Sequence, residues 1–244
     1  MLKLPNVTLF AIDCFTPELT IKAMEFSTRW VQFADSILLT DTSQFRLPVI
    51  PWLTVIHHPQ GDNHKVKRPY SPWHKDLPVD YEISVMREPP LHVKTSHLIH
   101  MEWDSAVMNR SAWTDDWLQY DFIGAPWPPH SEPGWPPCDG HTNSVGNGGF
   151  SLKSLRFCSL TRAATEVFKM EPPMFNSDMW PCRSIRHWLE DRGIKFAPER
   201  IADRFSCEDQ IYSGQFGMHG RKTCEMNNWG GPFFSKIRPK QTQR

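Results

Sequence analysis

The first forty residues alternate between strand and helix patterns, and this alternation restricts the possible folds strongly. Residues 7–13 form an apolar run that ends in an aspartate, which predicts a buried strand. Thr16, Pro17 and Glu18 are typical of a helix start, and apolar residues continue at helical spacing over 19–34. Residues 36–40 predict a second buried strand. A strand, a helix and a strand in succession favour a parallel sheet that is covered by helices.

The rest of the chain continues these patterns, and no linker divides it. Further strands are predicted at 53–56, 97–101 and 194–197, and further helices at 81–88, 112–119, 154–168 and 179–192. We expect one α/β domain over residues 1–235, with an open, mostly parallel mixed sheet. The polar residues 236–244 are expected to form a tail.

Acidic residues follow several of the predicted strands. Asp13, Asp41, and the pair Glu102 and Asp104 each come directly after an apolar run. In open α/β sheets, ligands bind at the carboxyl ends of the strands. We therefore expect these acids to face one edge of the sheet, with Asp13 and Asp41 as contacts to a bound base or ribose.

The charge balance and the apolar runs exclude some classes of protein. Lys and Arg total 27, as do Asp and Glu, so the formal net charge of zero argues against a nucleic-acid binder. The N-terminal residues lack the features of a signal peptide, and no run approaches the roughly 18 apolar residues of a membrane span. We expect a cytoplasmic protein without a transmembrane segment, and widely spaced cysteines that are free thiols.

Tryptophan and proline are both abundant, with 11 and 22 residues. Trp127 and Trp135 lie in a proline-rich segment, where their flat rings could stack on a sugar. A hydrophobic plug beneath that segment explains them equally well.

Two acids separated by one residue, Glu102 and Asp104, can both reach one cation where a strand has just ended. Oxygen ligands suit Mg²⁺ or Mn²⁺ that is bound to a substrate diphosphate. The same triplet also occurs at ordinary surface turns, so the motif alone does not establish a metal site.

A glycine-rich segment lies at 145–151 and contains Gly146, Asn147, Gly148 and Gly149. Glycines let the backbone approach a ligand and present its N–H groups. The segment matches neither the dinucleotide-binding nor the P-loop pattern. A plain β-turn accounts for it as well as a ligand loop does.

Asp178 and His219 are two further candidates. Asp178 begins a predicted helix, where an aspartate can cap the helix or act as a catalytic base. His219 stands in a glycine-containing segment near the C-terminus and would have to meet Asp104 from far along the chain. Sequence spacing alone does not show whether His219 and Asp104 are in contact.

Five strings, in this order, resemble a family of glycosyltransferase-like proteins that is catalogued as a domain of unknown function: MEWDSAVMNRSAW, DDWLQYDFIGAPWP, VGNGGFSLKS, GIKFAPERIADRFSCE and FGMHG. The family is similar to divergent GT-A glycosyltransferases. The resemblance therefore implies an α/β/α sandwich, a nucleotide-sugar donor, and a divalent metal such as Mn²⁺ or Mg²⁺.

The resemblance also implies roles for single residues. Glu102, Asp104 and His219 would be the metal ligands, Asp104 and the glycine turn would bind the donor, and Asp178 would be the base of an inverting transfer. Trp127 and Trp135 are the candidates for acceptor binding, and the acceptor itself is unknown.

The chain departs from the family pattern at three positions. Glu102 replaces a glutamine, Ser105 replaces a glycine, and Ser177 replaces a glutamate. The missing glutamate at Ser177 leaves open a non-catalytic carbohydrate-binding protein on a decayed transferase fold. A second alternative is a metal-dependent sugar-nucleotide or phosphoester hydrolase that uses the same acids.

Overall fold

A computed structural model describes residues 1–59, 79–127, 143–168 and 176–229. Its centre is a six-stranded sheet with the order β3-β2-β1-β4-β7-β6. These strands are Thr54–His57 (β3), Val31–Thr40 (β2), Leu2–Ile12 (β1), His97–Met101 (β4), Phe150–Ser154 (β7) and Phe122–Ile123 (β6). The first four run parallel, whereas β7 is antiparallel to both β4 and β6. The prediction of an open, mostly parallel mixed sheet is confirmed.

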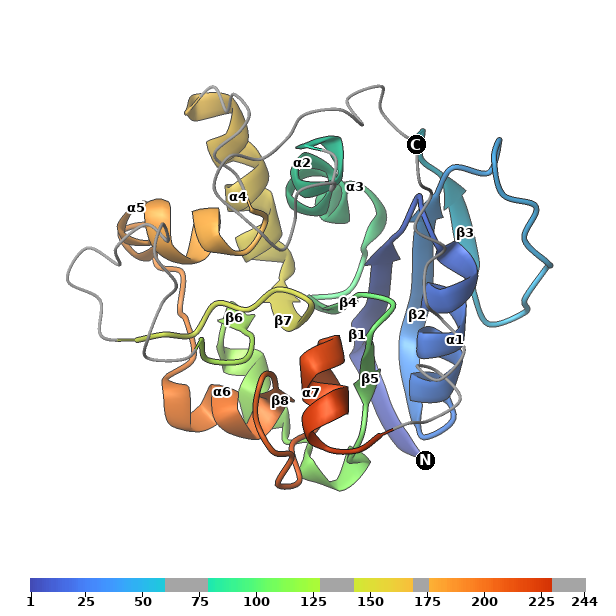
Figure 1. Cartoon of the computed structure of the whole chain (residues 1–244). Coiled ribbons are helices and arrows are strands. Elements are labelled where there is room, and N and C mark those ends of the chain that lie inside the picture. The colour runs from blue at the N-terminus through green and yellow to red at the C-terminus, as the bar shows by residue number, and fades with distance from the viewer. Residues whose placement is uncertain (60–78, 128–142, 169–175, 230–244) are drawn as a thin grey trace, which may run out of the picture.

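Helices cover both faces of this sheet (Figure 1). Helices α2 (Val79–Arg87), α3 (Pro89–His92) and α4 (Leu155–Val167) pack against one another on one face. Helix α1 (Pro17–Thr28) lies on the other face and contacts strand β5 (Ser105–Val107). Shorter helices follow at Arg186–Glu190 (α5), Glu199–Phe205 (α6) and Arg221–Met226 (α7). The expected three-layer α/β/α arrangement is therefore present.

A second, three-stranded sheet has the order β5-β9-β8, in which β9 is Gly217–His219 and β8 is Ser206–Cys207. Strands β5 and β9 are antiparallel, and Ser105 pairs with His219. This register brings His219 beside the segment that carries Glu102 and Asp104.

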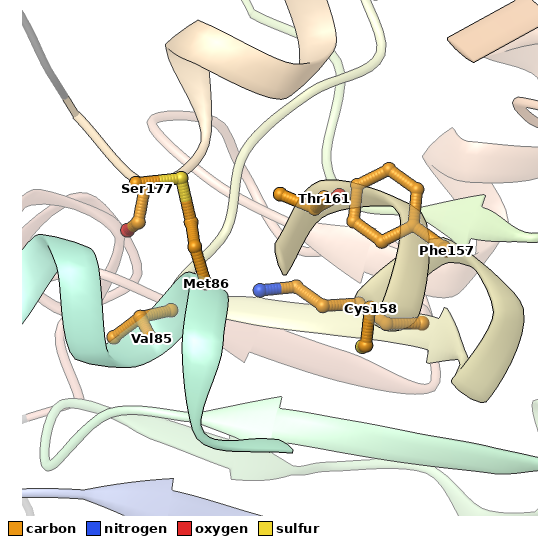
Figure 2. A pocket seen from close by; sticks show the side chains of 7 residues that line it. Val85, Met86, Phe157, Cys158, Thr161 and Ser177 are labelled. Carbon is orange, nitrogen blue, oxygen red and sulfur yellow. The ribbon is translucent and has the colours of Figure 1, made fainter. Parts of the chain in front are cut away.

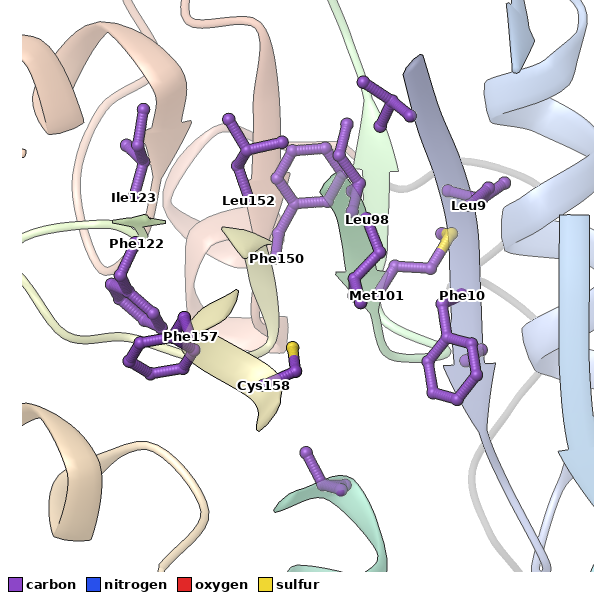
Figure 3. Packing of buried hydrophobic residues seen from close by; sticks show 14 of the residues in the cluster. Leu9, Phe10, Leu98, Met101, Phe122, Ile123, Phe150, Leu152, Phe157 and Cys158 are labelled. Carbon is purple, nitrogen blue, oxygen red and sulfur yellow. The ribbon is translucent and has the colours of Figure 1, made fainter. Parts of the chain in front are cut away.

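The core between the helices and the main sheet is apolar and continuous. Figure 3 shows side chains from β1, β4 and β7 meeting there, including Leu9, Phe10, Leu98, Phe150 and Leu152, which are all fully buried. Parallel strands with helices on both faces are expected to be apolar along their length. The buried core gives the sheet edge a rigid support.

Several predicted elements differ from the structure. The helical pattern at 19–34 is wrong after Thr28, because β2 begins at Val31 and its first residues alternate between buried and exposed. The predicted helix at 179–192 is broken into a π-helical turn, Trp180–Ser184, and α5. Pro181 lies in that turn and cannot donate a backbone hydrogen bond.

Other differences are smaller. Residues 112–119 form 3-10 turns at Arg110–Ala112 and Asp115–Gln119 instead of one helix. The predicted strand at 194–197 makes a single bridge, between Phe196 and Phe122. The predicted tail at 236–244 and Trp135 lie outside the described residues.

Candidate functional site

The sheet places the predicted acids at one edge. Asp13 follows β1, Asp41 follows β2, and Glu102 follows β4, and these three strands are parallel. Their carboxyl ends therefore share an edge of the sheet.

Asp13 and Asp41 bind groups of their own loops. The carboxylate of Asp13 accepts the backbone N–H groups of Phe15 and Thr16, each at 2.8 Å, and the Thr20 hydroxyl at 2.6 Å. Burial raises the pKa of Asp13, and these hydrogen bonds lower it in part. Asp41 accepts hydrogen bonds from Ser43 and Gln44. Both carboxylates hold local turns, and donor contacts for them stay predictions.

Glu102, Asp104 and His219 meet beside the small sheet. His219 Nε2 lies 3.4 Å from Glu102 Oε2 and 3.4 Å from Asp104 Oδ1. One potential ligand atom from each of the three residues lies within 4.8 Å of the other two. His219 is 15% exposed and Glu102 is 32% exposed, so an ion can enter from solvent.

Glu208 completes this cluster, and the sequence patterns do not indicate it. It follows β8, which runs parallel to β9, and its Oε2 lies 3.1 Å from His219 Nδ1. Burial would lower the pKa of His219, but Glu208 and Asp104 raise it well above its ordinary value. We call Glu102, Asp104, Glu208 and His219 the acid–histidine cluster.

The acid–histidine cluster fits a divalent cation. Glu208 Oε2 and His219 Nδ1 face each other at 3.1 Å, whereas Asp104 Oδ1 is buried without a hydrogen bond to any described residue and lies 3.4 Å from His219 Nε2. Buried polar atoms normally have partners, and a bound ion is one explanation for exceptions. Two carboxylates and one imidazole are suitable ligands for Mn²⁺, while Glu208 stands behind the imidazole on its other nitrogen.

The glycine turn connects this cluster with Asp178. A Cβ atom at Gly149 would stand 2.1 Å from His219 Nε2, and a Cβ at Gly148 would stand 2.8 Å from Asp178 Cβ. The N–H of Gly148 donates to Asp178 Oδ2 at 3.1 Å. Two successive residues of the turn thus need to be glycine because side chains press on the backbone from both directions.

Other residues shape this turn. Asn147 is buried, and its Oδ1 accepts the N–H of Gly149 at 3.1 Å. The Gly149 carbonyl in turn accepts the N–H of Glu102 at 3.0 Å. Asn147 therefore stabilises the turn from within, and a contact of its side chain with a donor stays a prediction.

Asp178 is half-buried at the start of the π-helical turn. Its Oδ1 accepts the N–H of the next residue, Met179, at 2.6 Å, but Asp178 is not the cap of the turn, because Met179 holds the N-cap position and makes no side-chain cap bond. Burial raises the pKa of Asp178 to about 7, with a further increase from the charge of Glu82, while the N–H of Gly148 lowers it. The helix-cap interpretation of Asp178 is therefore wrong, whereas a carboxyl with such a pKa can exchange a proton near neutral pH, as the base interpretation requires.

Trp127 is 7% exposed and lies against Gly146, where a Cβ atom would stand 2.1 Å from its ring. The guanidinium of Arg183 stacks over the same ring, 4.5 Å from its centroid. These contacts favour the interpretation of Trp127 as a hydrophobic plug beneath the proline-rich segment. Stacking of Trp127 or Trp135 on an acceptor stays a prediction.

A small cavity lies between α2 and α4 (Figure 2). Its lining consists of Val85, Met86, Lys153, Phe157, Cys158, Thr161 and Ser177. It has room for about one water molecule. A cavity of this size does not accommodate a sugar nucleotide.

Comparison with known proteins gives one family match. The model described as "Protein of unknown function (DUF5672)" matches residues 91–220. That range includes the acid–histidine cluster, the glycine turn and Asp178. No curated protein matches the chain.

Two similar solved structures are of the glycosyltransferase GlyE in Streptococcus pneumoniae TIGR4. The apo form is 12% identical, with a TM-score of 0.48, and the match covers 88% of this chain and 54% of that one. The second is 11% identical, with a TM-score of 0.41, and the match covers 80% of this chain and 45% of that one. The chain thus spans about half the length of these two structures.

Within the described ranges, no helix is both long and apolar enough to cross a membrane.

Proposed function

The chain belongs to the DUF5672 family of proteins of unknown function, and we propose that it transfers a sugar from a nucleotide-sugar donor to an acceptor hydroxyl. One observation carries this proposal: residues from remote parts of the chain converge on a single turn. Glu102, Asp104 and His219 gather on one side of the glycine turn, and Asp178 binds the turn from the other.

Each group has a role in such a reaction. Glu102, Asp104 and His219 would hold a divalent cation, Mn²⁺ or Mg²⁺. When bound, this ion supplies positive charge to the diphosphate that leaves the sugar. The two carboxylates and the imidazole would keep the ion beside the glycine turn, where the small residues Gly148 and Gly149 leave the backbone uncovered by side chains of their own.

Asp178 would serve as the base. A carboxylate that accepts a proton near neutral pH can remove the proton from an acceptor hydroxyl as the hydroxyl oxygen attacks the anomeric carbon. Attack on the face opposite the leaving diphosphate would invert the configuration at that carbon. The pKa of about 7 places Asp178 in the range where this exchange is efficient.

The experiment is a thermal-unfolding screen of nucleotide sugars, with Mn²⁺ or with EDTA. A donor at ten times its Kd should raise Tm by about 3–6 °C when Mn²⁺ is present. Asp104→Ala should lose this increase. Asp116→Ala is a matched control, because Asp116 is an exposed acid outside the acid–histidine cluster.

Product analysis then separates the outcomes for the donor that binds. A glycosylated product supports transfer, and free sugar without any acceptor product would instead establish a hydrolase. Sugar binding that survives EDTA, with no turnover, would establish a carbohydrate-binding protein. Either of the last two results would overturn the proposal.

A further inference from the structure

Helix α2 contacts both halves of the candidate site through two consecutive residues. The Tyr81 hydroxyl donates to Glu102 Oε1 at 3.2 Å. Glu82 Oε2 accepts the backbone N–H of Ser177 at 2.5 Å. Ser177 precedes Asp178, so α2 reaches the acid–histidine cluster with one side chain and the candidate base with the next.

Glu82 is only 3% exposed, although it carries a carboxylate. Such a group is expensive to bury and needs compensation. The Ser177 N–H provides part of it, and its 2.5 Å contact ties α2 to the segment that carries Asp178. A glutamate in this place contributes a directed hydrogen bond and a negative charge, and these contributions can be separated by mutation.

The charged and titratable groups around Asp178 come from several elements. Glu82 faces it from α2 and Glu208 from the end of β8, and both raise its pKa. Lys153 on β7 and Cys182 in the π-helical turn also interact with it electrostatically. After burial, Glu82 is the largest cause of the raised pKa, because a neighbouring negative charge opposes ionisation of Asp178.

We propose that Glu82 is the positioning residue of Asp178: it anchors the backbone at Ser177 and places a second carboxylate beside the base. The proposal rests on the role of Asp178 described above, and it adds a partner that neither the sequence patterns nor the family match includes. The matched range begins at residue 91, after α2.

The test is an NMR titration of the Asp178 side-chain carboxyl carbon, which needs neither donor nor acceptor. The wild-type midpoint should lie near pH 7, in agreement with the raised pKa of Asp178. Glu82→Gln keeps an oxygen that accepts the Ser177 N–H but removes the charge. In this variant the titration midpoint of Asp178 should fall by about one pH unit, because the neighbouring negative charge is gone.

Glu88→Gln is the control, since Glu88 lies just past α2 and bonds His92 instead. Its midpoint should equal that of the wild type. Equal midpoints in the wild type and Glu82→Gln, with both folded, would overturn the proposal.

A second measurement covers the case in which Glu82→Gln does not fold. In the wild type, the Ser177 amide hydrogen should exchange slowly with solvent, because the buried carboxylate of Glu82 accepts it. Exchange at the rate of an exposed amide would contradict this anchor and overturn the proposal.

Failure of this inference can be distinguished from failure of the proposed function. If Asp178→Asn retains transfer, Asp178 is not the base, whatever the titration shows. If Asp178→Asn loses transfer while Glu82→Gln leaves the Asp178 midpoint unchanged, Asp178 is the base but Glu82 is not its positioning residue. Glu82→Gln should also shift the acid limb of the transfer profile to lower pH, which a merely structural residue would not do.

Discussion

The two halves of the sheet edge carry similar carboxylates but satisfy them differently. At the ends of β1 and β2, Asp13 and Asp41 accept hydrogen bonds from their own loops. Beyond β4 and β8, Glu102, Asp104 and Glu208 come from different elements and converge on His219. An acid after a strand is therefore weak evidence for a ligand site, whereas carboxylates from different elements that converge on one imidazole are stronger evidence.

The largest effect is expected at Asp178. The change Asp178→Asn should reduce the rate of transfer by about 10²–10⁴-fold, because it removes the group that takes the acceptor proton. Donor binding should remain, since the metal ligands are intact. Initial rates and donor affinity measured on the same preparation check this, and normal turnover would remove Asp178 from its role.

A smaller effect is expected from Glu208, which contacts His219 on the nitrogen remote from Glu102 and Asp104. The change Glu208→Gln should weaken Mn²⁺ binding by about 10–100-fold, because a carboxylate that bonds the far nitrogen of a ligating histidine orients the ring and makes it a stronger ligand. Calorimetric titration with Mn²⁺ measures this. An unchanged affinity for Mn²⁺ would show that Glu208 does not support the metal site.

The raised pKa of Asp178 should also make the stability of the folded protein depend on pH. Its folded pKa of about 7 exceeds its ordinary value of 3.8, so the folded state binds this proton more tightly. The stabilisation is present below the ordinary value and is lost as the pH rises through about 7. Between pH 4 and pH 8, the wild type should therefore lose about 1–2 kcal/mol more than Asp178→Asn. Urea unfolding at both pH values checks the difference, and parallel curves would contradict it.

The smallest effect separates the two halves of the edge most cleanly. Asp13→Ala should lower the free energy of unfolding by about 1 kcal/mol, because the N–H groups of Phe15 and Thr16 and the Thr20 hydroxyl lose their acceptor. Its affinity for Mn²⁺ should equal that of the wild type. A loss of Mn²⁺ affinity in this variant would show that the two halves act as one site.

Local sequence patterns were enough to predict the main sheet and the edge of it where the acidic residues lie. Apolar runs located β1, β2 and β4, and the acids that follow them do share an edge. The helix pattern failed after Thr28, because Val31 and Phe33 fit either a helix or a strand until the pairing with β1 decides. Pairing of this kind is tertiary information that periodicity does not contain.

The site itself was only partly predictable. The role of Asp13 in its own turn has a local signal, an aspartate two and three residues before the backbone N–H groups that it accepts, and could have been inferred. Glu82 and Glu208 have no such signal, because each acts on a residue brought near by the fold. Glu82 and Ser177 are 95 positions apart, and only the packing of α2 unites them.

Binding of Mn²⁺ tests the proposed metal site most directly, and the electron paramagnetic resonance signal of free Mn²⁺ measures it. Wild-type protein should remove one Mn²⁺ per chain from solution, Asp104→Ala and His219→Ala should remove none at the same concentration, and Asp13→Ala should behave as the wild type. Mn²⁺ uptake that is absent in the wild type, or that survives both changes in the acid–histidine cluster, would contradict it.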